Sequence, residues 1–187
     1  MDQKLSYLLI PLIGYSKSGK TKSIENLIAY LTNQKYFVIA LKHTGNNKFS
    51  IDTEGKNTWR YSQAGANIVS SHSQGESSFI FNSELSSQDL LNFVEYLIQW
   101  PLLNPSRLPL VVLCEGFRDL KKDHILCVQS LEDLIAQKNE YTVAISGQIC
   151  GKADLIREIR SHFSIPIING LNDPEKLINL FKFPNSN

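Results

Sequence analysis

The sequence has few cysteines and almost no net charge. Its 187 residues include three cysteines, and 19 basic against 18 acidic side chains leave a formal charge of +1. A nucleic-acid-binding surface normally shows an excess or a stripe of basic residues, so the balanced charge argues against such a partner. Cys114, Cys127 and Cys150 are odd in number and widely spaced. This pattern excludes a paired metal-ligand spacing and a disulfide framework, and we expect buried, reduced thiols.

Long apolar segments are lacking as well. The run from Leu8 to Ile13 is far shorter than the roughly 20 residues that cross a bilayer, and residues 1–4 do not begin a signal peptide. We therefore expect a cytoplasmic protein with no membrane partner. A chain of 187 residues suits one well-packed domain better than two, so we expect a single domain over residues 1–187.

The sequence does contain an alternation of short apolar runs and amphipathic helical patterns. We expect strands at residues 5–13, 36–41, 67–71, 78–81, 108–114, 141–146 and 165–168, and helices at 19–32, 90–98, 152–163 and from 173 onward. Such an alternation predicts an α/β fold built on a mostly parallel, doubly wound sheet. A small β-rich insertion at about residues 67–82 would interrupt it.

Eight residues between the first strand and the first helix match a phosphate-binding pattern at every fixed position. They are Gly14, Tyr15, Ser16, Lys17, Ser18, Gly19, Lys20 and Thr21, and they fit G-x-x-x-x-G-K-[ST]. The glycines let the loop curl so that backbone N–H groups face phosphate oxygens, and the helix N-terminus adds its dipole. We expect Lys20 to reach the β- and γ-phosphates and Thr21 to bind Mg²⁺. Together with Ser23, these residues predict a nucleotide site in a three-layer, P-loop NTPase-like fold.

Two further segments carry candidate site residues. Glu115 follows the most apolar strand, where a carboxylate holds Mg²⁺ directly or through water, and Gly116 would let the backbone approach the γ-phosphate. Asp52 begins a D-x-x-G pattern and would bind Mg²⁺ or orient the attacking water. Lys42 would contact phosphate and His43 a ligand, although a solvated lysine and a hydrogen-bonded structural histidine fit equally well.

The ordered set of motifs resembles one family, the molybdopterin-guanine dinucleotide biosynthesis adapter proteins, called MobB. The matching segments are Gly14 to Thr21, Lys42-His43, Asp52 to Trp59, Ala64-Gly65-Ala66 and Glu115-Gly116-Phe117-Arg118. The resemblance implies a GTP-binding protein with weak GTPase activity, in which Lys20, Asp52 and Glu115 are catalytic and Mg²⁺ is held by Thr21, Asp52 and Glu115. It would assist the guanylyltransferase that attaches GMP to molybdopterin.

Other properties also follow from the resemblance. It makes molybdopterin itself a candidate partner. The β-rich insertion at about residues 67–82 would serve dimerisation, so we expect a homodimer. No N-K-x-D guanine-reading sequence is present, so GTP as the ligand is implied by the resemblance alone.

Two alternative functions remain open from the sequence. A small-molecule kinase or ATPase would share the phosphate loop but typically needs a lid bearing arginines, and the chain has only five arginines, with no evident cluster. A nucleotide-gated binding module would use the same loop to change its affinity for a partner, without productive catalysis.

Overall fold

The computed structural model describes residues 6–46 and 49–183, and the chain divides into two compact units. One unit comprises Met1–His43 and Asn92–Asn187, and the other comprises Thr44–Leu91. The expected single domain over residues 1–187 stays a prediction. No helix within the described residues is long and apolar enough to cross a membrane.

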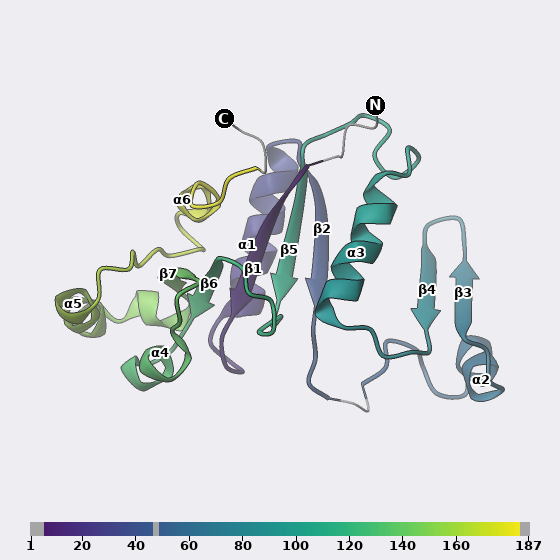
Figure 1. The fold of residues 1–187 in the computed structure, drawn as a ribbon, viewed down its shortest axis with the longest axis horizontal. Coiled ribbons are helices and arrows are strands. Elements are labelled where there is room, and N and C mark those ends of the chain that lie inside the picture. Colours follow the sequence, from purple (N-terminus) through teal and green to yellow (C-terminus); the bar gives the residue numbers. More distant parts are fainter. Residues whose placement is uncertain (1–5, 47–48, 184–187) are drawn as a thin grey trace. The chain divides into compact units, whose positions relative to one another are not determined.

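A five-stranded parallel sheet forms the centre of the first unit (Figure 1). Its strands are β1 (Tyr7–Ile13), β2 (Phe37–Lys42), β5 (Leu110–Glu115), β6 (His124–Cys127) and β7 (Thr142–Ser146), in the order β2-β5-β1-β6-β7. The carboxyl ends of parallel strands meet at one edge. From β1 the chain continues to β2 and β5 on one side and later to β6 and β7 on the other. Open α/β sheets bind their ligands at the carboxyl edge where the strand order changes direction in this way.

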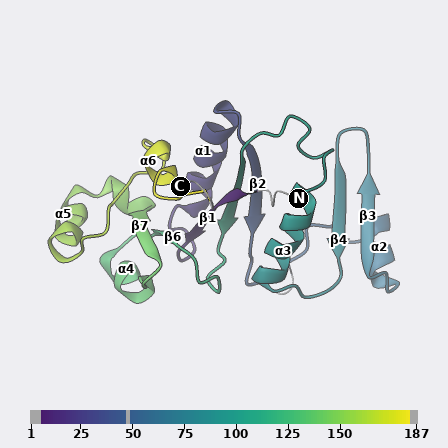
Figure 2. The same cartoon turned by 45° about the horizontal axis from the view of Figure 1, so that its top comes forward.

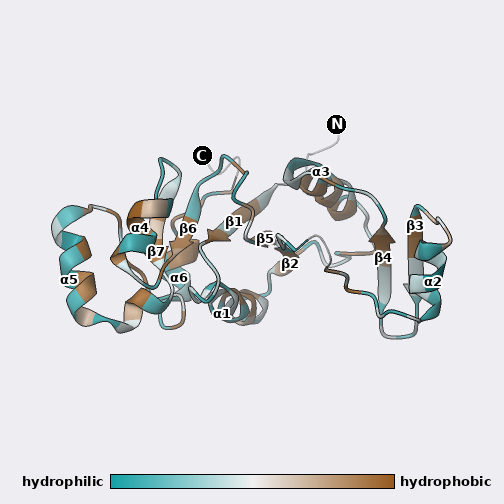
Figure 3. Ribbon diagram, turned by 90° about the horizontal axis from the view of Figure 1, so that it is seen from below, coloured by the Kyte–Doolittle hydropathy of each residue, from teal (hydrophilic) through white to brown (hydrophobic). Residues whose placement is uncertain are grey.

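Helices cover both faces of this sheet. They are α1 (Lys20–Asn33), α3 (Ser87–Ile98), α4 (Leu131–Gln137), α5 (Ala153–His162), α6 (Pro174–Ile178) and the short 3₁₀ helix η1 (Gln148–Gly151). Neighbouring strand residues point to opposite faces, and Ile125 and Leu126 of β6 accordingly belong to different buried clusters. The first cluster joins the sheet to α1 and α6, which Figure 3 shows on one side of it, and the second joins it to α4 and α5.

The second unit contains the short helix α2 (Asn57–Gln63) and an antiparallel pair of strands, β3 (Ile68–His72) and β4 (Ser77–Phe81). Figure 2 shows α2 beside β3. Helix α3 begins in this unit and ends in the first, where the Tyr7 hydroxyl donates to Glu95 at 3.3 Å. The β3–β4 pair is the small β-rich insertion expected at residues 67–82.

The expected α/β architecture with a mostly parallel sheet is confirmed, with differences in detail. Strand β6 and helices α2 and α4 were not expected. Residues 165–168 form no strand, because their one ladder contact is an isolated bridge between Ile145 and Ile167. Leu5, the first residue of the first expected strand, lies outside the described residues.

A buried histidine joins β6 to β7. His124 is 3% exposed, and its two ring nitrogens lie 3.1 Å from the Lys122 carbonyl oxygen and 3.0 Å from the Thr142 hydroxyl. A carbonyl only accepts, so Nδ1 carries the proton and Nε2 accepts from Thr142. Burial lowers the pKa of His124 below its ordinary value of 6.5, opposed by the Lys122 carbonyl bond. The imidazole is therefore held neutral in the folded protein.

This histidine predicts a loss of stability in mild acid. Below its ordinary pKa of 6.5 the unfolded chain binds a proton that the folded chain resists, so the stabilisation is complete above that pH and is lost as the pH falls toward the folded-state pKa. We expect the free energy of unfolding in urea to decrease from pH 7.5 to pH 5.5, and the decrease to be smaller in His124→Gln. His162→Gln, at an exposed position, is the control and should keep the full decrease. An equal decrease in all three proteins would contradict the assignment.

Candidate nucleotide-binding site

The phosphate loop joins β1 to α1 at the carboxyl edge of the sheet. Gly14 leaves β1 so close to β6 that a Cβ there would lie 2.2 Å from the Cys127 carbonyl oxygen, which explains why the pattern requires glycine. The 14-residue helix α1 begins at Lys20. The first N–H groups of a helix have no intrahelical acceptor, and its dipole favours anions there. An anion at this loop would therefore be favoured by these N–H groups and by the helix dipole.

Lys20 folds back over the loop that precedes it. Its Nζ donates to the carbonyl oxygens of Gly14 at 3.0 Å and Tyr15 at 2.7 Å. Burial lowers the pKa of Lys20, while the carboxylate of Glu115 acts in the opposite direction. Two neutral carbonyl oxygens thus hold the ammonium group at the mouth of the loop. Negatively charged phosphate oxygens would be stronger acceptors and would take their place.

Thr21 and Glu115 meet across the gap between α1 and β5. The Thr21 hydroxyl lies 3.1 and 3.2 Å from the two carboxylate oxygens of Glu115. Lys42, the last residue of β2, places its Nζ 3.3 Å from the same carboxylate, whose side chain is only 13% exposed. The register explains the meeting, because Glu115 pairs with Leu12 of β1 and with Lys42 of β2. The predicted Mg²⁺ ligands Thr21 and Glu115 are therefore adjacent.

These groups face one hollow of about 460 Å³. It is lined by Ser16, Lys17, Ser18, Gly19, Lys20, Thr21, Lys22, Lys42, Glu115 and Gln148. Five basic or hydroxyl-bearing loop residues and one carboxylate give it the character of a site for a phosphate chain with a divalent cation. Within the described residues, no three His, Cys, Asp or Glu side chains cluster as a metal site. A cation here would therefore need oxygen ligands from the phosphates and from water.

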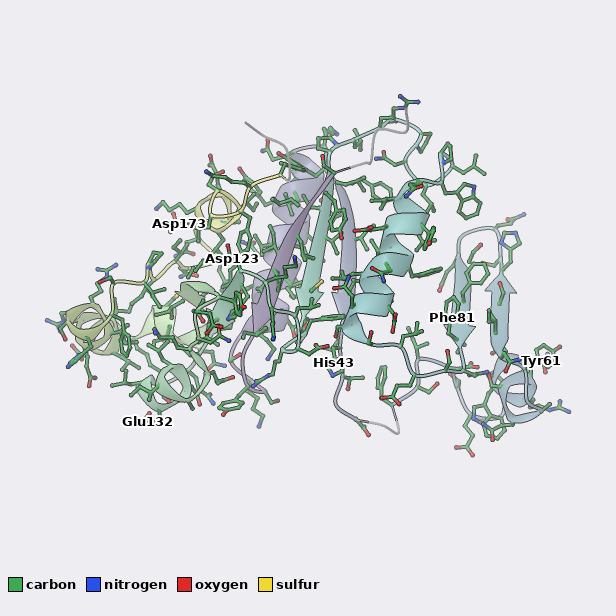
Figure 4. The ribbon with its side chains drawn as sticks, viewed as in Figure 1. His43, Tyr61, Phe81, Asp123, Glu132 and Asp173 are labelled. Atoms are coloured by element: carbon green, nitrogen blue, oxygen red, sulfur yellow. The ribbon has the colours of Figure 1, made fainter. Side chains whose placement is uncertain are left out.

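Other predicted residues have structural contacts near the hollow without lining it. The N–H of His43 donates to the Glu115 carbonyl oxygen at 2.9 Å, and its ring packs edge-on against Phe117 with centroids 5.9 Å apart. Figure 4 shows His43 at the carboxyl end of β2. Gly116 has φ +88°, and its N–H donates to the Leu12 carbonyl oxygen at 3.0 Å. Both residues hold Glu115 in place from either side.

Ser23 and Tyr15 also lie outside the lining of the hollow. Ser23 is buried on the inner face of α1, near Gly170. The ring of Tyr15 is covered by the guanidinium of Arg118, whose Cζ lies 4.9 Å from the ring centroid and whose Nη2 donates to Gln137 at 2.9 Å. The predicted contacts of Ser23 and Tyr15 with a nucleotide stay predictions.

Asp52 belongs to the unit Thr44–Leu91. Its Oδ1 accepts from the N–H of Thr53 at 2.8 Å and from the Thr58 hydroxyl at 2.9 Å. Its Oδ2 is buried and has no hydrogen-bond partner among the described residues. A buried carboxylate oxygen without a partner is uncommon. The catalytic and metal-binding roles of Asp52 stay predictions.

The sequence interpretation missed two residues that contact the loop, Gly147 and Gln148. A Cβ on Gly147 would lie 2.2 Å from the Ser18 carbonyl oxygen. The backbone N–H of Gln148 donates to that oxygen at 3.0 Å, and its side-chain Nε2 donates to the Lys17 carbonyl oxygen at 2.6 Å. A signal was available, since both residues follow an expected strand whose carboxyl end shares an edge with the phosphate loop.

Comparison with known proteins then decides the family. The model of the family described as "Molybdopterin guanine dinucleotide synthesis protein B" (MobB) matches residues 9–148. This chain belongs to the MobB family. A Haemophilus influenzae molybdopterin-guanine dinucleotide biosynthesis adapter protein is 41% identical over 61 residues, which cover 33% of this chain and 34% of that protein. The chain thus matches about a third of that relative's length.

Two other MobB relatives are matched over longer stretches. A probable adapter protein of the same name from Bacillus subtilis is 26% identical over 138 residues, covering 73% of this chain and 74% of the relative. A putative one from Methanocaldococcus jannaschii is 31% identical over 127 residues, covering 67% of this chain and 47% of the relative.

Solved MobB structures share the fold. The crystal structure of Bacillus subtilis MobB has a TM-score of 0.73 at 24% identity and covers 94% of this chain and 99% of that one. The structure of a MobB homologue from Bacillus stearothermophilus has a TM-score of 0.58 at 20% identity, with coverages of 92% and 94%. These likenesses confirm the α/β, P-loop NTPase-like fold.

Proposed function

We propose that this MobB-family chain is a GTP-binding adapter with weak GTPase activity, which assists the attachment of GMP to molybdopterin in molybdopterin guanine dinucleotide biosynthesis. The observation that carries the proposal is the hollow in which Lys20, Thr21 and Glu115 face the phosphate loop. The pathway is supported by the family and by the names of the relatives from Haemophilus and Bacillus.

The residues of the hollow suit a triphosphate with Mg²⁺. Thr21 and Glu115 offer a hydroxyl and a carboxylate within 3.2 Å of one another, and such oxygen atoms are the ligands that Mg²⁺ prefers. Bound Mg²⁺ would neutralise charge on the β- and γ-phosphates. Lys20 would leave the loop carbonyls for the phosphate oxygens, and the N–H groups at the start of α1 would hold the developing negative charge.

Turnover is expected to be slow, because no arginine of the described residues lines the hollow. Arg118, which follows Glu115 by three residues, contacts the Tyr15 ring and donates to Gln137. The same observation favours a second candidate function, a nucleotide-gated binding module without productive catalysis. Tight GTP binding with no measurable phosphate release would favour this module over the weak GTPase.

Calorimetric titration with GTP and ATP, each with and without Mg²⁺, tests the proposal. We expect binding that prefers GTP and strengthens with Mg²⁺. A preference for ATP would instead support a kinase or ATPase, and binding of neither nucleotide would refute the assignment.

The proposed partners are the molybdenum cofactor guanylyltransferase and, in complex with it, molybdopterin. The family description and the relatives' names support this pathway. Co-purification of the guanylyltransferase with the chain, compared in the presence of GTP and of GDP, measures the association. Equal absence of the enzyme in both conditions would exclude a stable, nucleotide-dependent complex.

We also expect the chain to be a homodimer joined through β3 and β4. Ile68 and Phe79 are 56% and 62% exposed. The register pairs Ile68 with Phe81 and Ser70 with Phe79, so Ile68, Phe79 and Phe81 lie on one face of the strand pair. Figure 3 colours parts of both strands as hydrophobic. A two-stranded sheet is marginally stable alone in water. A second copy would cover this face.

Phe79→Asp is therefore expected to convert a dimer into a monomer, because it places a charge within an apolar contact. Analytical ultracentrifugation of the wild type and the variant measures the change. Gln74→Asp, in the exposed turn between the strands, adds the same charge and should leave the dimer intact. A wild-type protein that sediments as a monomer would exclude this assembly.

A further inference from the structure

We propose that Gln148 is a positioning residue that holds the phosphate loop in the shape that binds anions. The inference rests on the proposed nucleotide-binding function and adds a residue to its machinery. Gln148 lies 131 positions after Lys17 and opens η1 at the carboxyl end of β7. It belongs to neither the phosphate-loop pattern nor the carboxylate strand β5.

Two consecutive carbonyl groups of the loop are held by this one residue. Its side-chain Nε2 donates to the Lys17 oxygen at 2.6 Å, and its backbone N–H donates to the Ser18 oxygen at 3.0 Å. The C=O and N–H groups of a trans peptide point in opposite directions. Fixing these two oxygens on Gln148 therefore turns the N–H groups of Ser18 and Gly19 away from it, and that of Ser18 lies 3.3 Å from the Tyr15 oxygen inside the loop.

The loop needs such a contact because its apex is strained. Lys17 has φ +63°, a left-handed conformation that is unfavourable for any residue with a Cβ. Strained backbone persists where its surroundings fix it. The side-chain bond from Gln148 ends on the carbonyl of that strained residue, so it stabilises this conformation against relaxation.

The side chain at position 148 has to donate a hydrogen bond, and an amide can do so. Both groups to be held are carbonyl oxygens and need donors, and a glutamine side chain supplies N–H without a charge. Any residue other than proline at position 148 retains the backbone bond to Ser18, so only the bond to Lys17 depends on the side chain. Gln148→Met keeps the length of the side chain and removes the donor.

Titration with inorganic triphosphate and with GTP, both with Mg²⁺, tests the inference. In Gln148→Met we expect both affinities to fall by the same factor, about fivefold to tenfold, as for one lost hydrogen bond. The thermal unfolding temperature of the ligand-free protein should stay near that of the wild type. Equal losses for the two ligands indicate an effect on the phosphate loop and not on contact with the nucleoside.

Substitutions at position 17 separate positioning from simple contact. In a Lys17→Gly background the strain is removed, so Gln148→Met should weaken triphosphate binding by about twofold or less. Lys17→Ala also lacks the ammonium group but keeps the Cβ, so in that background the full loss should remain. A glutamine that only stabilised the fold would give the same loss of affinity in both backgrounds. A smaller loss in Lys17→Gly than in Lys17→Ala therefore indicates that Gln148 positions the loop.

The outcomes that overturn the inference are distinct. Unchanged affinities in Gln148→Met, a loss for GTP alone, or equal losses in both position-17 backgrounds would each refute the positioning role. A wild-type protein that binds neither ligand would refute the proposed nucleotide-binding function, and this inference with it.

Discussion

Replacing Lys20 with alanine is expected to lower the affinity for GTP about 100-fold, as for the loss of a charged hydrogen-bond donor in a partly buried site. Lys20 Nζ lies at the mouth of the hollow, where it now donates to the Gly14 and Tyr15 oxygens. Its four-carbon stem lets the ammonium turn to a phosphate without moving α1. Alanine keeps the helix, so the change should weaken binding and spare the fold.

Calorimetry with GTP and inorganic triphosphate measures the effect, and circular dichroism checks the fold. Lys176→Ala is the matched control, because it removes one exposed lysine on α6 that forms an ion pair with Asp173. It should bind both ligands as the wild type does. Unreduced binding in Lys20→Ala would show that the nucleotide is held elsewhere and would remove the main support for the proposed function.

Gly147→Ala is expected to affect both stability and binding. The new Cβ would lie 2.2 Å from the backbone oxygen of Ser18 and 3.1 Å from Cys127, at a position with φ +91°. Positive φ costs about 1–2 kcal/mol for a residue with a Cβ, and overpacking adds about 1–3 kcal/mol. We expect a loss of about 3 kcal/mol in the free energy of unfolding, with a thermal midpoint about 6–12 °C lower.

The binding effect follows from the same clash. The backbone oxygen of Ser18 can yield only if the phosphate loop moves, so affinity for triphosphate should fall as well. Gly151→Ala, four residues along the chain, is the control: its Cβ would meet nothing within 4 Å, and neither property should change. A Gly147→Ala protein with wild-type stability and affinity would mean that the loop tolerates displacement.

Local patterns selected Thr21 and Glu115, which the structure places side by side. The fixed positions of the loop are set by chemistry at short range, and Glu115 was found because a buried parallel strand ends at it. The β1–β5 pairing then places Glu115 opposite Leu12, two residues before the loop. Strand order was not predicted, but the shared edge of a parallel sheet sufficed to bring Thr21 and Glu115 together.

Shorter elements and distant contacts escaped prediction for physical reasons. Strand β6 has four residues, and α2 and α4 have seven each, too few to show a clear period. Ser23 lies one helical turn before Leu27 and shares its buried face, and its predicted contact with the nucleotide stays a prediction. The bond from Gln148 to Lys17 depends on tertiary folding across 131 positions.

The closeness of Gly14 to the Cys127 oxygen and the bonds from Gln148 have a consequence for the order of biosynthesis. The phosphate-binding motif is complete at residue 21, but the surfaces that shape it come from the second half of the polypeptide. Chains are synthesised from the N-terminus, and contacts of high sequence separation form late. A nascent chain therefore carries the whole motif long before the loop is shaped, and under the proposed function nucleotide affinity would report the completion of folding.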